Sequence, residues 1–305
     1  MFRLDGVEIE DTFAELFEMW AGRVLITAEN EKWALTAANV ATGYASSIIG
    51  SPAEAGIEGV VSPKDTPDGR IGVLIQIYHH SRGDLKKQMI ARIGQCVMTC
   101  PTTAAFDGLP RAARRLKVGR SLRLFGDGFQ KKDEIAGRTV WRIPVMDGEF
   151  TVESRFGVKK APAGGNFLVF AKDSRSGLKA AEDAVEAIRN NSDRVIMPFP
   201  GGICRSGSKN GSLKYKLPAS TNHPFCPTLK GMVSDTQVPK GVNSIYEIVM
   251  NGLTLEDVEK AMGEGIRAAA KVPGVLKISA GNYGGRLGPI KVYLHKILEN
   301  SKFTV

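Results

Sequence analysis

One acidic residue is a candidate for chemistry because it lies inside an apolar stretch. The segment NSIYEIVM (243–250) alternates as a strand does, which places Glu247 on the same face as Ile245 and Val249. A carboxyl on an apolar face is costly to ionise, so its pKa should rise. A neutral carboxylic acid can donate a hydrogen bond to a developing oxyanion. Glu247 is therefore the candidate catalytic residue. The alternatives are a solvent-facing Glu at an edge and a structural partner for a buried Lys or Arg.

Three loops rich in Gly and short polar side chains are candidate walls of a binding site. They span residues 51–70, 200–223 and 279–288. Backbone N–H groups and small hydroxyls can hold a polar ligand such as a pterin ring or a carboxylate. The alternative for each loop is a surface turn built of small residues.

Other kinds of site lack their sequence signals. The chain has no G-x-G-x-x-G, no Walker A motif and no G-x-S-x-G elbow, which argues against a nucleotide cofactor and a serine nucleophile. The four cysteines form no C-x-x-C and the four histidines are scattered, so we expect neither a disulfide framework nor a metal site. The first residues show no secretory signal and no apolar run is long enough to span a membrane. Free thiols then favour a cytoplasmic protein.

The charge of the chain is positive and unevenly distributed. The formal net charge is +9 and the isoelectric point is about 9.4. The stretch 111–123 contains no acid and six cations: Arg111, Arg114, Arg115, Lys117, Arg120 and Arg123. This stretch is either a solvated face or a set of contacts to an anionic partner.

Two halves of the chain show the same order of elements, β-α-β-β-α-β. In the first half we expect a strand, a helix, two strands, a helix and a strand at residues 23–28, 30–43, 44–50, 71–78, 83–94 and 95–99. In the second half the same elements are expected at residues 166–172, 176–191, 194–199, 243–250, 254–272 and 274–281. The pattern predicts an α+β fold with two ferredoxin-like (βαββαβ) lobes from an internal duplication.

The remaining segments complete this architecture. Residues 106–165 predict short strands joined by Gly turns, as extra β structure inserted between the lobes. We place the domain boundary between an N-terminal lobe plus insertion at 1–155 and a C-terminal lobe at 156–305. Residues 11–21 have Thr12 and Glu15 at capping-box spacing, which predicts a short helix.

Ten collinear motifs resemble one family, formylmethanofuran:tetrahydromethanopterin formyltransferase. They span nearly the whole chain: VEIEDTFAE (7–15), RVLITA (23–28), PAEAGI (52–57), TPDGR (66–70), RIGQCVMTCPTT (92–103), AGGNF (163–167), PFPGGI (198–203), PASTN (218–222), YEIVMNGL (246–253) and PGVLKISAGNYGG (273–285). The resemblance implies two ferredoxin-like lobes in a cytoplasmic homotetramer. It also implies reversible formyl transfer between N-formylmethanofuran and N5 of tetrahydromethanopterin in one-carbon metabolism such as methanogenesis.

The resemblance also implies the parts of the site. Methanofuran and tetrahydromethanopterin are substrates, with no metal and no permanently bound cofactor, and the catalytic carboxyl of the Y-E-I-V motif is Glu247. Positioning, oxyanion stabilisation and proton traffic to the leaving amine are then the tasks of the protein. The candidate substrate-binding residues are Gly201, Gly202, Ser206, Ser208, Lys209, Ser220, Thr221, Asn222, Asn282, Tyr283, Gln95, Thr99 and Thr102.

Two other functions compete with this interpretation. A basic ferredoxin-like protein can bind RNA, although the expected strands offer few aromatic side chains for base stacking. We therefore expect no nucleic-acid partner and no membrane contact. The second alternative is an inactive paralogue that acts as a subunit of a formyl-dehydrogenase complex. An assay with the two coenzymes discriminates between these functions.

Overall fold

The computed structural model describes residues 2–286 and 288–300, which form two compact units. The C-terminal unit comprises Met1–Glu18 and Pro162–Val305, and the N-terminal unit comprises Met19–Ala161. The first residues of the chain thus belong with its last half. The domain boundary placed between residues 155 and 156 stays a prediction.

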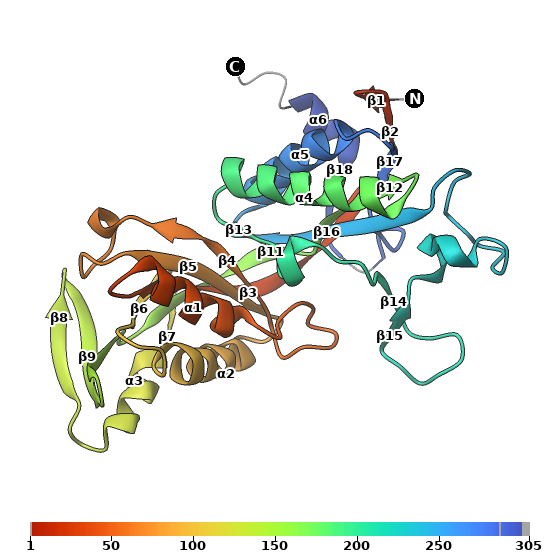
Figure 1. Cartoon of the computed structure of the whole chain (residues 1–305). Helices are drawn as coiled ribbons and strands as arrows, with labels where there is room; N and C mark the ends of the chain where they lie inside the picture. The colour runs from red at the N-terminus through yellow and green to blue at the C-terminus, as the bar shows by residue number, and fades with distance from the viewer. Residues whose placement is uncertain (1, 287, 301–305) are drawn as a thin grey trace. The chain divides into compact units, whose positions relative to one another are not determined.

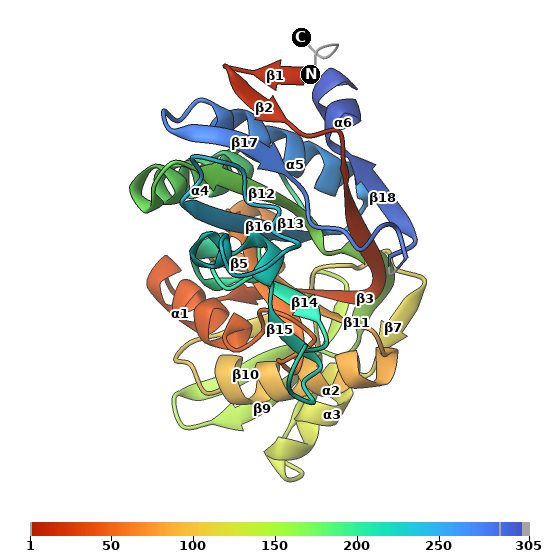
Figure 2. The ribbon, with the colours of Figure 1, turned by 90° about the vertical axis from the view of Figure 1, so that its right-hand side faces the viewer.

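The C-terminal unit is built on a six-stranded sheet, seen in Figure 2. The strand order is β1 (Phe2–Leu4), β2 (Val7–Ile9), β17 (Val275–Ser279), β12 (Gly165–Ala171), β16 (Ser244–Gly252) and β13 (Val195–Ile196). Neighbouring strands are antiparallel except for β17 and β2, which are parallel. A separate short strand, β18 (Ile290–Tyr293), pairs with Phe13–Leu16 at the start of β3.

Two long helices cover one face of this sheet. α4 (Ser174–Asn191) and α5 (Leu255–Ala270) pack side by side over β12 and β16 (Figure 1). Their Ala- and Ile-rich stripes share a core with Phe167 and Met250. Thr254 caps α5 in a capping box with Asp257, as the spacing predicts. A last helix, α6 (Leu294–Asn300), packs against α5.

The opposite face of the sheet has a smaller apolar layer. Leu168 and Phe170 of β12 are buried there with Val238 and Val242, and Ile245 packs against them. Successive residues of β12 thus enter different cores, because side chains alternate across a strand. This second face is open to loops rather than to helices, and it carries the functional candidate.

The N-terminal unit contains a longer sheet. Its main path is β4 (Glu54–Val61), β5 (Gly72–His79), β3 (Phe13–Thr27), β6 (Ala104–Asp107), β10 (Gly148–Glu153), β9 (Arg138–Val145) and β8 (Lys131–Ile135). Off this path, β11 (Phe156–Ala163) pairs with β3 and with β7 (Arg114–Leu116). The helices α1 (Glu31–Thr42), α2 (Arg82–Arg92) and α3 (Val118–Leu122) supply side chains to one core with Val73, Ile75 and Val152.

The α+β class is confirmed, and most of the helices and strands are confirmed near their predicted positions. The helices predicted at 30–43, 83–94, 176–191 and 254–272 are all present. Strands also cover most of the predicted ranges 23–28, 71–78, 166–172, 243–250 and 274–281. The range 194–199 contains only the two-residue strand β13. The interpretation of the two units as duplicated ferredoxin-like lobes stays a prediction.

The helix predicted at 11–21 is wrong, because Phe13–Thr27 is one long strand. β3 is paired along its length with other strands, and these ladders outweigh the local helix signal. Thr12 and Glu15 do not form a capping box. The Thr12 hydroxyl accepts a hydrogen bond from Asn282, and the Glu15 carboxylate accepts three backbone N–H groups of residues 283–288.

Three predicted strands of the N-terminal unit are also wrong. Residues 44–50 form turns, and the strand beside β5 follows at 54–61, inside the predicted loop. The predicted strand at 95–99 overlaps a π-helical turn, Ile93–Val97, which extends α2, and the sheet is completed by β6. Within 106–165, where short strands were predicted, the segment SLRLFGDGF (121–129) was interpreted as one of them. It instead continues α3 into a 3-10 turn, Arg123–Gly126.

Candidate functional site

Glu247 lies in the middle of β16, on the face away from the long helices. Its register partner on β12 is Leu168, whose own partner on β17 is Ser279. Leu168 and Ser279 are both buried. The carboxyl is therefore attached to the penultimate strand of the sheet, beside an apolar side chain, as strand alternation predicted.

Burial raises the pKa of Glu247 from its ordinary value of 4.5 to about 7. Removal of water disfavours the charged carboxylate, and this is the larger effect. A hydrogen bond with the Cys204 side chain acts in the opposite direction, because it favours the carboxylate. At neutral pH a substantial fraction of the side chain is thus a carboxylic acid, which can donate a hydrogen bond.

Cys204 forms an isolated antiparallel bridge to Glu247. The Cys204 N–H donates to the Glu247 carbonyl at 2.8 Å, and the Glu247 N–H donates to the Cys204 carbonyl at 3.0 Å. This bridge anchors the loop after Pro200–Gly202 to the edge of β16. The thiol is 5 % exposed, and burial together with Glu247 raises its pKa. Cys204 is therefore a neutral thiol that fixes the surroundings of Glu247.

Tyr283 approaches the same carboxyl from the loop after β17. Burial raises the pKa of its hydroxyl, and the carboxylates of Glu247 and Glu15 raise it further. The loop is held by Glu15, which accepts hydrogen bonds from the backbone N–H groups of Tyr283 at 2.7 Å, Gly285 at 3.1 Å and Gly288 at 2.6 Å. A neutral phenol with 39 % exposure thus faces solvent close to Glu247.

Asn166 connects β12 to the start of that loop. Its side-chain amide donates to the carbonyls of Gly164 and Gly281, each at 3.1 Å, and its oxygen accepts from the Gly281 N–H at 2.5 Å. The amide of Asn282 is also engaged in the fold, because it donates to Thr12 and to the Phe13 carbonyl. These amides position the loop, and Asn282 has no free amide hydrogen for a ligand.

The loop between β13 and β16 contains eight of the predicted binding residues. β14 (Ser208–Asn210) and β15 (Ala219–Thr221) form a small hairpin. Lys209 donates to Ser220 at 2.8 Å, and Ser220 donates to the Gly211 carbonyl at 2.7 Å, so this pair stabilises the hairpin. Ser208 and Thr221 are register partners with exposed side chains.

The other members of this loop lie around Cys204 and Cys226. Ser206 contacts the Cys204 thiol at 3.5 Å, and the Asn222 carbonyl accepts from the Cys226 thiol at 3.4 Å. Gly201 and Gly202 have φ of +65° and +89°, which glycine adopts without strain. A Cβ on Gly202 would also lie 3.0 Å from Val185 of α4. This turn lets the chain pass between α4 and the bridge to Glu247.

Gln95, Thr99 and Thr102 belong to the N-terminal unit. Thr99 donates to the Gln95 carbonyl at 2.8 Å within the π-helical turn, and both side chains are exposed. Thr102 has φ of +64°, and its hydroxyl accepts from the Glu29 N–H at 3.2 Å. Arg70 of the TPDGR motif donates to the Thr102 carbonyl. Thr99 and Gln95 thus contact each other, whereas Thr102 contacts Glu29 and Arg70.

Sequence reasoning missed the residues that surround Glu247 from other segments. Leu168 is the register partner of Glu247, Ser279 is the partner of Leu168, and Asn166 is paired with Val249. No local sequence pattern reveals these pairings. Glu15 lies in a stretch predicted as a helix. Its three hydrogen bonds to backbone could have been found only by asking which acid satisfies the N–H groups of Tyr283, Gly285 and Gly288.

The described residues contain neither a cluster of metal-ligating side chains nor a helix that could span a membrane. Within 2–286 and 288–300, no three His, Cys, Asp or Glu side chains gather as metal ligands. The helices in that part of the chain are too short or too polar to cross a bilayer. All four cysteines are free thiols.

A partly protonated carboxyl on an apolar sheet face, beside a neutral thiol and phenol, is the kind of site that stabilises an oxyanion in acyl transfer. Family models agree with this class. The model described as "Formylmethanofuran-tetrahydromethanopterin formyltransferase" matches residues 2–145, and that described as "FTR, proximal lobe" matches residues 148–297. The chain belongs to the formylmethanofuran–tetrahydromethanopterin formyltransferase family, which is a family of transferases.

Individual relatives are similar over nearly their whole length. The formyltransferases of Methanocaldococcus jannaschii and Methanopyrus kandleri are 55% and 53% identical to this chain, over 97% and 96% of it and 99% of each relative. The solved formyltransferase from Methanosarcina barkeri is 50% identical and superposes with a TM-score of 0.93 over 97% of this chain and all of that one. A formyltransferase/hydrolase complex from Methylorubrum extorquens, solved with methylofuran, contains a chain that is 42% identical with the same TM-score, covering 97% of this chain and 98% of that one.

Proposed function

We propose that this protein transfers a formyl group reversibly between N-formylmethanofuran and N5 of tetrahydromethanopterin. Family membership over almost the whole chain supports this reaction. The observation that carries the mechanism is the position of Glu247, a carboxyl with a pKa of about 7 on an apolar sheet face. Both coenzymes are substrates in this proposal, and no further cofactor is needed for the balance of the reaction.

The reaction proceeds in two steps through a tetrahedral intermediate. The lone pair of N5 forms a bond to the formyl carbon, and the carbonyl π electrons move to the formyl oxygen. The neutral Glu247 carboxyl donates a hydrogen bond to this oxyanion. When the intermediate collapses, the proton lost by N5 reaches the methanofuran nitrogen, and the bond from that nitrogen to the formyl carbon breaks. N5 is a competent nucleophile, so positioning supplies much of the remaining acceleration.

The residues around Glu247 keep it neutral and in place. Cys204 and Tyr283 are themselves neutral at pH 7, because burial and nearby carboxylates raise the pKa of each group. A neutral environment does not stabilise the carboxylate as a cation would, so a substantial fraction of Glu247 stays protonated near neutral pH. Cys204 fixes the backbone of Glu247, and the Tyr283 ring offers an aromatic edge for a substrate.

The exposed loop residues are the proposed substrate contacts. Ser206, Ser208, Thr221 and Tyr283 present hydroxyls to solvent in the C-terminal unit. The other predicted residues of this unit stabilise the conformation of their own loops: Gly201, Gly202, Lys209, Ser220, Asn222 and Asn282. Gln95, Thr99 and Thr102 are proposed to contact substrate from the N-terminal unit.

We infer that each unit is a ferredoxin-like lobe and that the two arose by duplication. Both have the element order β-α-β-β-α-β, as β3, α1, β4, β5, α2, β6 and as β12, α4, β13, β16, α5, β17. Both sheets also place the first strand of the unit between the third and the fourth. A homotetramer, and association with a hydrolase complex like that of Methylorubrum extorquens, remain proposals that analytical ultracentrifugation and co-purification would test.

The experiment is an assay of formyl transfer with purified coenzymes and two variants. Glu247→Ala should lower turnover roughly 10²–10³-fold, the usual loss for one oxyanion donor. Glu259→Gln is the matched control, because Glu259 is also a partly buried glutamate with a raised pKa, on α5. Its turnover should stay within about twofold of the wild type. A drop smaller than threefold for a folded Glu247→Ala protein would remove Glu247 from the mechanism. Absence of transfer by the wild type would favour the inactive paralogue.

A further inference from the structure

A cavity of about 660 Å³ lies within the N-terminal unit, and none of its lining residues belongs to the candidate site described above. It is bordered by α3, by the β8–β9 hairpin and by the segment that follows β10. Its lining is basic and includes Arg115, Arg120, Arg123, Lys132, Arg138 and Arg155. The volume falls in the range of sites that hold a small molecule.

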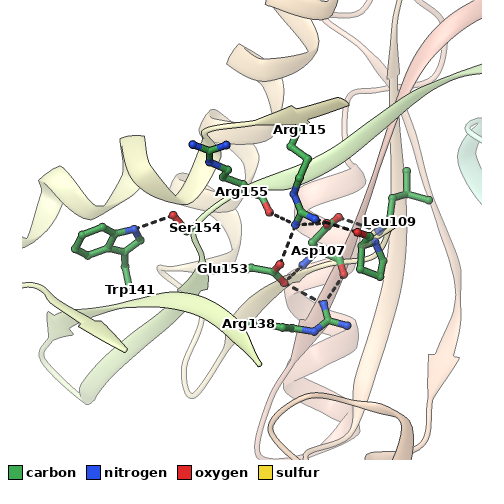
Figure 3. A network of polar contacts seen from close by, with 9 residues as sticks. Asp107, Leu109, Arg115, Arg138, Trp141, Glu153, Ser154 and Arg155 are labelled. Atoms are coloured by element: carbon green, nitrogen blue, oxygen red, sulfur yellow. Dashed lines mark hydrogen bonds and ion pairs between the residues drawn. The ribbon is translucent and has the colours of Figure 1, made fainter. Parts of the chain in front are cut away.

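Two buried carboxylates hold together a polar network at this cavity, and Figure 3 shows that network. Asp107 and Glu153 are 1 % and 5 % exposed. Arg115 donates to Asp107 at 2.9 Å and to Glu153 at 3.1 Å, and Arg138 donates to Glu153 at 3.0 Å. Burial of Asp107, with Glu153 as a lesser cause, raises the pKa of Asp107, whereas backbone N–H groups and Arg115 lower it. The two arginines are therefore fixed in place, and the two acids balance their charge.

The geometry leaves hydrogen-bond donors for a ligand. The Arg138 contacts to Glu153 and to the Asp107 carbonyl both use Nη1. Within residues 2–286 and 288–300, its Nη2 and Nε groups make no hydrogen bond. A guanidinium with one edge held by a carboxylate presents its other edge in a set orientation, which suits the oxygens of a second anion.

Four further cations on the walls have no carboxylate of their own. Arg120, Lys132 and Arg155 are exposed and form no ion pair with any residue that the structure describes. Arg123 lies over the Trp141 ring at 4.6 Å, and the indole N–H donates to Ser154 at 3.2 Å. Six cationic side chains thus line the cavity, and the two buried acids balance the charge of two of them, which leaves four positive charges unbalanced. Mutual repulsion of these cations is relieved when an anion enters.

We propose that this cavity binds a small polyanion that carries two or more carboxylate or phosphate groups. The cations converge on a concave space rather than following a stripe, which favours a compact ligand over a nucleic-acid strand. Trp141 is the one aromatic ring among the lining residues, and Arg123 lies over one of its faces, so that face is not open for base stacking. This inference is argued from the N-terminal unit alone and uses no residue of the Glu247 site.

The β8 strand supplies a matched pair of variants. Lys132 is the register partner of Trp141, and it lines the cavity. Lys131 is its neighbour and the partner of Arg142, so it points to the opposite face of the hairpin. Both lysines are exposed, and each substitution by Gln removes one charge from the same strand.

The test is calorimetric titration of the whole protein with citrate and with inorganic triphosphate, at constant ionic strength. Both probes should bind, and Lys132→Gln should weaken the binding roughly fivefold or more, while Lys131→Gln stays within about twofold. A double variant, Arg120→Gln with Arg155→Gln, should weaken it by at least about tenfold. A preference for one probe identifies the ligand as a carboxylate or as a phosphate.

Tryptophan emission locates the site. Binding should change the emission of the wild type, and Trp141→Phe should abolish that change. Binding that is equal in the two lysine variants, or no binding at millimolar probe, overturns the proposal. So does acetate binding as tightly as citrate, because a single charge would then suffice. A single-stranded oligonucleotide that binds more tightly than triphosphate and depends on Lys132 would replace the small polyanion with a nucleic acid.

Discussion

Formyl transfer should slow as the pH rises through neutrality, because the active form of Glu247 is the protonated one. Burial raises the pKa of this carboxyl to about 7. A group with that pKa is about nine-tenths protonated at pH 6 and about one-tenth protonated at pH 8. If only the protonated form donates to the oxyanion, kcat/KM should fall about tenfold between these two pH values.

The assay is the initial rate of formyl transfer at limiting formylmethanofuran, measured at constant ionic strength. Glu247→Gln is the informative variant, because its amide keeps a hydrogen-bond donor but does not titrate. Its rate should be lower than that of the wild type and flat from pH 6 to 8. A wild-type rate that rises over this interval would refute the reasoning, since it would make the carboxylate the active form. An equal fall in the variant would assign the titration to another group.

Three further substitutions test how the fold supports the site. Glu15→Gln should lower the free energy of unfolding by about 1–3 kcal/mol in urea titration, because three backbone N–H groups depend on its carboxylate. Thr254→Ala should cost about 1 kcal/mol in the same measurement through loss of the α5 cap. Gly265→Ala should cost about 1–3 kcal/mol, because its Cβ would lie 2.8 Å from the Phe167 ring. For each variant, a free energy of unfolding equal to that of the wild type would contradict the role given to the contact that the substitution changes.

The sequence predicted the helices well because each has a stripe and clear ends. α5 carries both a capping box at Thr254 and an apolar face that packs on β12. Residues 11–21 carry a similar capping signal and nevertheless form a strand. The difference is tertiary, since the N–H and C=O groups of β3 find partners in strands that are distant in sequence.

Sequence reasoning predicted the central residue of the candidate site but not its neighbours. Glu247 was found because strand alternation places it on the same face as Ile245 and Val249, and an acid on an apolar face is conspicuous. Its neighbours Cys204 and Leu168 come from other segments, and their approach depends on strand register. Lys209 and Ser220 were chosen as ligand contacts by residue type, but each has a partner within its own hairpin. Residue type does not show whether a polar group is already satisfied.

The basic stretch 111–123 illustrates the same limit. Its charge was evident from the sequence, but the sequence did not show which of its cations form ion pairs within the fold. Arg115 is held by two buried acids that lie elsewhere in the chain, whereas Arg120 has no ion-pair partner among the described residues. Only the fold separates the cations that stabilise the unit from those available to a ligand.

The most direct measurement is the pKa of Glu247 itself. Infrared difference spectra between the wild type and Glu247→Gln isolate the protonated carboxyl band, which can be followed across pH. A midpoint near pH 7 is expected from the burial of this side chain on the apolar face of β16. A midpoint near the ordinary value of 4.5 would show a solvated carboxylate and would contradict the proposed role as an oxyanion donor.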